Sequence, residues 1–249
     1  PPERRVDELL RMMERGYPVF ARSARGCRFT DADGHEYLDY LMGFGPILLG
    51  YDDPNVRAAV DSQMRKGTIN TLAHEQEIAV AELLLELNPW GERVGFLIGG
   101  SACVGSAVRL ARAHTGRSVV VRCGYHGWHD WAVPNSAGVP AAVSALTREF
   151  PYNDLDALEA RLRKGDVACV VVETVQENGP APGFLSGCVE LAHSYGALCV
   201  FDETKTGFRV ALGGAAEYYE VTPDIATFGK ACANGLPGSF LIAAPGIAS

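Results

Sequence analysis

From Arg93 onward, short apolar runs alternate with helical patterns, and this alternation limits the fold more than any other feature of the sequence. Such alternation is typical of a mostly parallel β-sheet with helices on both faces. Strands are expected at residues 94–98, 118–122, 168–172, 197–201, 225–228 and 239–243. Helices are expected between them, at 103–114, 155–164 and 186–194. The sequence therefore predicts an α/β domain.

The part of the chain before this alternation has a different pattern. An amphipathic helix is expected at residues 6–13, and a turn at Asp31–Gly34 between two alternating runs predicts a β-hairpin over 27–40. A glycine-rich loop at 43–50 and helices at 54–66 and 74–88 complete this part. We therefore expect an N-terminal segment, residues 1–50, and a large domain, residues 51–249.

Composition excludes several classes of protein. The net charge of −8, with no cluster of lysine and arginine, argues against a nucleic-acid or anionic-membrane surface. The seven cysteines form no CxxC pair, which predicts a reducing cytoplasm and no metal site. No apolar run approaches the ~18 residues of a membrane span. We expect a soluble, untargeted cytoplasmic protein, unless a leader was removed from this chain.

In an open parallel sheet, ligands bind beyond the carboxyl ends of the strands, so the residues after each run are the candidates for a site. Gly100, Ser101 and Ala102 follow the first run and open a helix. Backbone N–H groups at a helix N-terminus favour an anion, so a phosphate could bind there. A tight turn that needs small residues is an equally good interpretation.

The second run is followed by Gly124-Tyr-His-Gly-Trp-His-Asp130. His126 and His129 beside Asp130 have the residue types of metal ligands. The aromatic and glycine residues among them favour a loop that lays a ring such as Tyr125 against a planar ligand, and we prefer stacking to metal binding. A buried histidine bonded to the backbone is the alternative for His129.

Two carboxylates and one lysine complete the set of candidates. Asp202 ends the run 197–201, and a buried carboxylate requires a cationic partner, which could be a pyridinium nitrogen or Arg209. Glu173 ends the run 168–172 in the same way. Lys230 follows the run 225–228, where partial burial would favour the neutral amine that reacts with aldehydes.

Together these groups match the parts of pyridoxal 5′-phosphate (PLP). The helix N-terminus suits the phosphate, the tyrosine suits the ring, Asp202 suits the pyridine nitrogen and Lys230 suits the aldehyde. Their convergence is stronger evidence than any single motif.

The sequence also resembles the class III PLP-dependent aminotransferases of fold type I, and within them the glutamate-1-semialdehyde 2,1-aminomutases. The resemblance rests on a series of motifs in the same order along the chain, namely 29–34, 37–40, 43–46, 107–117, 124–127, Asp202-Glu203, 206–209, 222–224 and Gly229-Lys230. It extends from about Cys27 to Pro237. The resemblance implies an enzyme, a transferase or isomerase, that transfers an amino group between a small amino donor and an oxo acceptor.

The same resemblance implies roles for individual residues. Lys230 and Asp202 would be catalytic, with Lys230 forming the Schiff base and Asp202 holding the pyridine nitrogen. The cofactor would also contact Tyr125, His126 and Glu173, together with the backbone at Gly100, Ser101 and Ala102. A homodimer is implied as well.

The sequence departs from the aminomutase pattern at three places. Ala102 replaces a glutamate beside the phosphate loop, Glu173-Thr174 replaces Glu-Pro, and Lys205 stands where the aminomutases usually have methionine. Family members also continue well past the lysine, so we expect the C-terminal small domain to be missing here. Alternatives are an amino-sugar or ω-amine transaminase, or a non-catalytic dimer partner with the same fold.

Overall fold

The computed structural model describes residue 18 and residues 20–247. These residues belong to two compact units, of which the first ends at Ala73 and the second begins at His74. The proposed boundary after residue 50 lies inside the first unit. The helix predicted at residues 6–13 lies outside the described residues.

The first unit contains a three-stranded antiparallel sheet in the order β1-β2-β3. Its strands are β1 (Ala21–Arg25), β2 (Arg28–Asp31) and β3 (Glu36–Leu38). The predicted hairpin is therefore confirmed, with β2 and β3 as its arms and a preceding strand paired to it.

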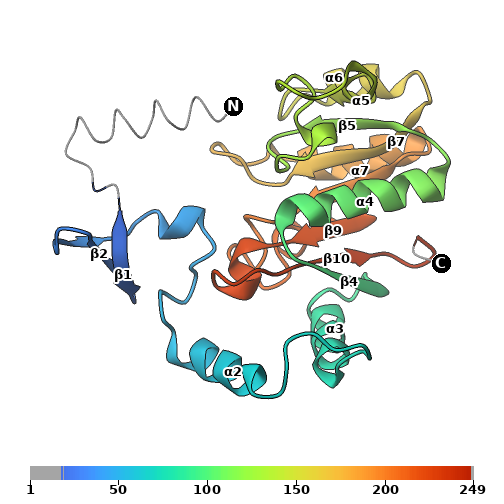
Figure 1. The fold of residues 1–249 in the computed structure, drawn as a ribbon. Coiled ribbons are helices and arrows are strands. Elements are labelled where there is room, and N and C mark those ends of the chain that lie inside the picture. Colours follow the sequence, from blue (N-terminus) through green and yellow to red (C-terminus); the bar gives the residue numbers. More distant parts are fainter. Residues whose placement is uncertain (1–17, 19, 248–249) are drawn as a thin grey trace. The chain divides into compact units, whose positions relative to one another are not determined.

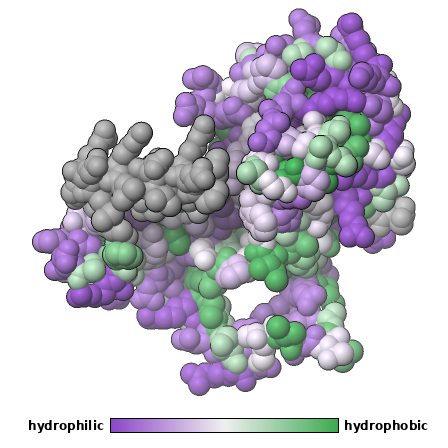
Figure 2. Space-filling model, turned by 45° about the horizontal axis from the view of Figure 1, so that its top comes forward, coloured by the Kyte–Doolittle hydropathy of each residue, from purple (hydrophilic) through white to green (hydrophobic). Residues whose placement is uncertain are grey.

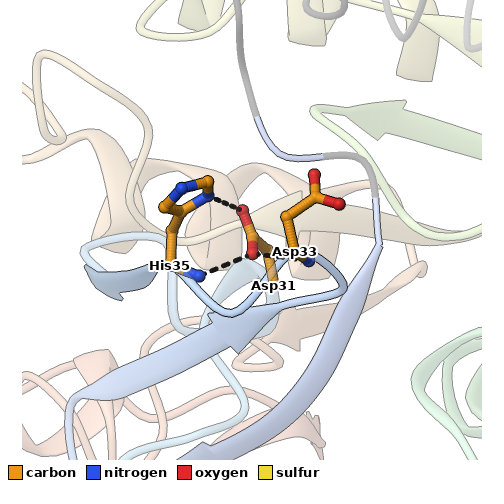
Figure 3. Close-up of side chains that lie close together, drawn as sticks. All are labelled: Asp31, Asp33 and His35. Atoms are coloured by element: carbon orange, nitrogen blue, oxygen red, sulfur yellow. Dashed lines mark hydrogen bonds and ion pairs between the residues drawn. The ribbon is translucent and has the colours of Figure 1, made fainter.

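Asp31 organises the turn of this hairpin (Figure 3). Its Oδ1 accepts the backbone N–H groups of Asp33 and His35, both at 2.9 Å. Its Oδ2 also accepts the hydroxyl of Tyr37 at 2.9 Å. Asp31, Asp33 and His35 carry metal-ligand atoms close together, but the turn itself already uses the buried carboxylate. The cluster is explained as a turn that satisfies its own backbone.

A short 3₁₀ turn and a helix follow in the same unit. The 3₁₀ turn η1 (Met42–Phe44) lies at the start of the predicted glycine-rich loop. Helix α2 (Pro54–Met64) begins after Asp53, whose side chain accepts the N–H groups of Asn55 and Val56 at 3.0 Å each. An aspartate cap followed by proline at the first helical position is a strong start signal, and the predicted helix is confirmed.

The second unit is built on a seven-stranded sheet in the order β4-β10-β9-β8-β7-β5-β6 (Figure 1). Its strands are β4 (Arg93–Leu97), β5 (Val119–Cys123), β6 (Thr147–Glu149), β7 (Val167–Glu173), β8 (Leu198–Asp202), β9 (Ile225–Phe228) and β10 (Ser239–Ala243). Neighbours from β6 to β9 are parallel, whereas β10 is antiparallel to both β4 and β9. The mostly parallel α/β sheet is confirmed.

Helices cover both faces of this sheet, as predicted. They are α3 (Glu75–Leu87), α4 (Gly100–Thr115), α6 (Leu155–Leu162) and α7 (Phe184–Ser194), with the short elements η2 (Asp130–Ala132), α5 (Ala141–Ser144), α8 (Ala215–Tyr218) and η3 (Lys230–Ala233). Helix α4 lies across one face, while α3, α6 and α7 pack against the other (Figure 1).

Alternate residues of the buried strands supply two separate cores. In β7, Val171 packs under α4, whereas Val170 and Val172 face the other core with α6 and α7. This division follows from the two-residue period of a strand, and it explains why these strands read as continuous apolar runs.

All seven cysteines are free, and five of them are buried. Burial raises the pKa of Cys123 to about 12, so this side chain acts as a small apolar group. None of the helices in the described part of the chain is both long and apolar enough to cross a membrane. Apolar residues also reach the surface (Figure 2), and the large exposed apolar side chains of the second unit include Ile78, Leu83 and Ile98.

Candidate active site

The strands β4, β5, β7, β8 and β9 end at one edge of the sheet, because β10 is the strand that runs in the opposite direction. A pocket lies at this edge. It is lined by Gly100, Ser101, Val104, Tyr125, His126, Gly127, Glu173, Asp202, Thr204, Lys205 and Lys230. The structure thus brings together every sequence-predicted site residue except Ala102, which lies in the first turn of α4 but does not line the pocket.

The N-terminus of α4 forms one wall of the pocket. No side chain caps this helix, and its first turn carries no acidic residue. The loop after β5 approaches it closely: a Cβ on Gly127, where φ is +93°, would lie 2.1 Å from Oγ of Ser101. Only glycine permits this approach. The N–H groups at the start of the helix remain available to an anion.

Glu173 also lines the pocket and contacts the start of the same loop. Its Oε2 accepts the N–H of Tyr125 at 3.1 Å, and its Oε1 forms an ion pair with Nζ of Lys205. Gly124 makes the turn possible, since a Cβ there would lie 2.4 Å from Cβ of Glu173. The ring of Tyr125 lines the pocket and is largely exposed.

Asp202 lies at the back of the pocket, held by His126. Its Oδ2 is 2.8 Å from Nδ1 of His126, and its Oδ1 accepts the N–H of Thr204 at 3.1 Å. Nε2 of His126 donates to the carbonyl oxygen of Cys123 at 2.8 Å. The histidine therefore orients the carboxylate from a fixed point on β5.

Two opposing effects set the charge of Asp202. Burial raises its pKa. The hydrogen bond and charge of His126 and the hydrogen bonds of Thr204 lower it by more, so the net pKa is below the usual value. The result is an ionised carboxylate in a buried position, which favours a cationic partner in the pocket.

The neighbouring histidine has no such role. His129 packs edge to face on Trp128 with ring centroids 5.0 Å apart. Among the described residues, the cluster with metal-ligand geometry is the hairpin turn of the first unit, and it includes neither His126 nor His129.

Lys230 follows β9 and Gly229 and starts η3 in a left-handed conformation, with φ of +47°. No described residue accepts a hydrogen bond from its Nζ. Burial lowers its pKa, and the charges of Lys205 and Arg209 lower it further, against the opposing charges of Asp202 and Glu173. Both effects favour the uncharged amine.

Four residues that line the pocket were not among the predicted site residues: Val104, Gly127, Thr204 and Lys205. Thr204 and Lys205 lie two and three residues after Asp202, so their place just beyond the strand end was a usable signal. Val104 lies one helical turn after Gly100 on α4, and its apolar side chain gave no signal that distinguishes it from a core residue.

Comparison with known proteins assigns the chain to a family. The model of the class III aminotransferases matches residues 12–249, and the chain belongs to this family. It is 42% identical over 228 residues to 3-aminobutyryl-CoA aminotransferase of Cloacimonas acidaminovorans (strain Evry), a match that covers 88% of this chain and 55% of the relative.

Solved structures show the same fold. An omega-transaminase from Sphaerobacter thermophilus matches with a TM-score of 0.87 and 30% identity, over 93% of this chain and 58% of that one. A glutamate-1-semialdehyde aminomutase from Pseudomonas aeruginosa PAO1 matches with a TM-score of 0.84 and 30% identity, over 93% and 55%. The chain therefore spans little more than half the length of the proteins that it matches.

The family depends on PLP, and a matched transaminase structure contains it. The residues of the pocket fit this cofactor. The uncapped N-terminus of α4 suits a phosphate, the ionised Asp202 suits a protonated ring nitrogen, and Lys230 offers an amine with no hydrogen-bond acceptor among the described residues. A Cβ at Gly100 would lie 3.2 Å from Cγ2 of Thr204, so the glycine lets the start of α4 pack closely on the segment after β8.

Proposed function

We propose that the protein is a PLP-dependent aminotransferase or aminomutase and that this chain carries its cofactor site. The observation that supports it most directly is the combination of Lys230 and Asp202 in one pocket. Nζ of Lys230 has no hydrogen-bond acceptor among the described residues, while Asp202 is a buried carboxylate with a lowered pKa. A free amine and a fixed carboxylate are the two protein groups that this chemistry requires.

When bound, PLP supplies an aldehyde that condenses with amines and a ring that accepts electrons from the substrate carbon. Nζ of Lys230 would then act as the base, because an uncharged amine at this position can take a proton from that carbon and later return it. Asp202 keeps a proton on the ring nitrogen through its negative charge.

The remaining residues bind and orient. His126 holds Asp202 in place, and the N–H groups of Gly100 and Ser101 at the start of α4 bind the phosphate. Tyr125 stacks on the ring, and Glu173 fixes the loop that carries it. Ala102 contributes at most its backbone N–H.

The substrates we propose are a small amino donor and an oxo acceptor. We also propose that the protein acts as a homodimer in the cytoplasm. The exposed apolar side chains of Ile78, Leu83 and Ile98 support this proposal, since association would remove them from water. The free cysteines suit a reducing compartment.

The decisive experiment maps the lysine that reacts with PLP. The chain is mixed with PLP and reduced with borohydride, and the modified peptide is identified by mass spectrometry. We expect the adduct on Lys230 and its loss in Lys230→Ala. Lys164→Ala, which changes an exposed lysine, is the matched control and should keep the adduct. An adduct that persists in Lys230→Ala would refute the role of Lys230.

A further inference from the structure

A second lysine lies in the pocket, and the proposed mechanism gives it no task. Lys205 follows β8 by three residues and lines the same pocket as Lys230. It also lines an adjoining, more polar pocket with Tyr152, Asn153 and Glu177. A lysine side chain at such a junction would normally extend into solvent and away from another ammonium group.

Glu173 holds the side chain of Lys205 at the pocket. The carboxylate of Glu173 forms an ion pair with Nζ of Lys205 through Oε1, while its Oε2 accepts the N–H of Tyr125 at 3.1 Å. Its side chain is only 8% exposed, and it ends β7 directly beside Asp202, its partner in the register of the two strands. The anchor of Lys205 is therefore itself fixed by the sheet and by the loop after β5.

The two lysines differ in their surroundings. The ammonium of Lys205 is paired with the carboxylate of Glu173. Lys230 has no acceptor in the described part of the chain, is half-buried and faces the charge of Lys205. A cationic neighbour is one of the known ways to keep a lysine amine uncharged.

We propose that Lys205, held by Glu173, is a positioning residue that keeps the amine of Lys230 uncharged and ready to react. This inference rests on the proposed function of Lys230. The charged groups that face Lys230 are Lys205 and Arg209 from the segment after β8, Asp202 from the end of β8 and Glu173 from the end of β7.

Their balance supports the inference. Burial is the largest effect that lowers the pKa of Lys230, and the charge of Lys205 is the next. The ion pair with Glu173 thus holds a cation at the pocket that Lys230 also lines.

The test measures the reactivity of Lys230 in the chain without cofactor. Trace labelling with acetic anhydride over the neutral to alkaline pH range, read by mass spectrometry, gives the labelling rate of Lys230 relative to the exposed Lys164. In Lys205→Met we expect labelling at neutral pH to fall by roughly 3- to 10-fold, the size expected for removal of one charge in a partly solvated site. The charge-conserving Lys205→Arg should remain close to wild type.

Two results would overturn the proposal. One is an unchanged labelling profile in a folded Lys205→Met chain, with Lys205→Gln as a second neutral variant if the first does not fold. The other is a Lys205→Arg chain that labels as slowly as Lys205→Met. A borohydride adduct on Lys205 in the wild-type chain would instead refute the proposed function, so the two failures are distinguishable.

Discussion

Asp202 and Glu203 are adjacent in sequence and almost fully buried, yet they belong to two different regions of the molecule. Asp202 faces the pocket, where His126 and Thr204 leave it able to accept a further partner. The side chain of Glu203 points away from the pocket, toward the N-terminus of α8. The alternation of side chains along an extended backbone separates them.

Their surroundings give the two carboxyls opposite properties. Oε2 and Oε1 of Glu203 accept the N–H groups of Ala215 and Ala216, both at 2.8 Å, and Thr206 donates to Oε2. Burial nevertheless raises the pKa of Glu203, whereas His126 brings the pKa of Asp202 below its usual value. One carboxyl holds the fold together and the other serves the pocket, and nothing in the dipeptide itself says which is which.

The largest effect that separates the two regions is expected in stability. Glu203→Ala removes the acceptor of two buried backbone N–H groups and of Thr206, so the free energy of unfolding should fall by roughly 2–5 kcal/mol. Urea denaturation followed by circular dichroism measures it. Glu203→Gln, which keeps one carbonyl oxygen, should lose less. A Glu203→Ala chain as stable as wild type would contradict the structural role.

A smaller effect is expected in cofactor binding. In Asp202→Asn the amide can still accept the N–H of Thr204 and face Nδ1 of His126, so the fold should be retained. The negative charge is lost, and PLP affinity should fall by roughly 10- to 100-fold, as for the loss of one charge-assisted contact. Titration with PLP followed by absorbance gives the affinity. Unchanged affinity would remove the proposed role of Asp202.

The smallest effect is the pH dependence of stability, which should have opposite signs for the two carboxyls. Asp202 has a lowered pKa, so the stability that its ionised form contributes is fully present above the usual pKa of 3.8. This stability is lost as the pH falls through the pKa of the folded state. Glu203 has a raised pKa, so stability is lost as the pH rises from 4.5 through the folded value.

Urea midpoints at a series of pH values test this difference. Asp202→Asn should lack the decline on the acid side of pH 3.8, and Glu203→Gln should lack the decline above pH 4.5. Profiles of the same shape in the wild type and both variants would show that neither carboxyl has the assigned environment.

Much of this fold could be predicted from the sequence, because its strands are buried on both faces and read as apolar runs. Strand β6 was missed, since Thr147, Arg148 and Glu149 form a short polar strand at the edge of the sheet. The direction of β10 was not predicted either. An apolar run does not encode its direction, and the antiparallel pairing with β4 is a property of the whole sheet.

The site was predictable to the extent that strand ends carry unusual residues. Lys230, Asp202 and Glu173 follow buried runs, and the structure places them in one pocket. The contact between His126 and Asp202 could not be derived, because the two residues come from different strands and meet only through the order of the sheet. The ion pair of Lys205 with Glu173 could not be predicted from the sequence for the same reason.

The position of β10 also has a consequence for how the polypeptide acquires its structure during synthesis. In the described sheet β4 is an edge strand whose neighbour is β10, which follows all the other described strands in the chain. Until β10 has been made, β4 and the helix that follows it can pack on the growing sheet, but β4 cannot pair with it. Such late, long-range pairing slows folding and leaves a strand edge open to wrong partners. The helix end that we assign to the phosphate follows β4, so it is fixed at the edge of the sheet only after β10 has been made.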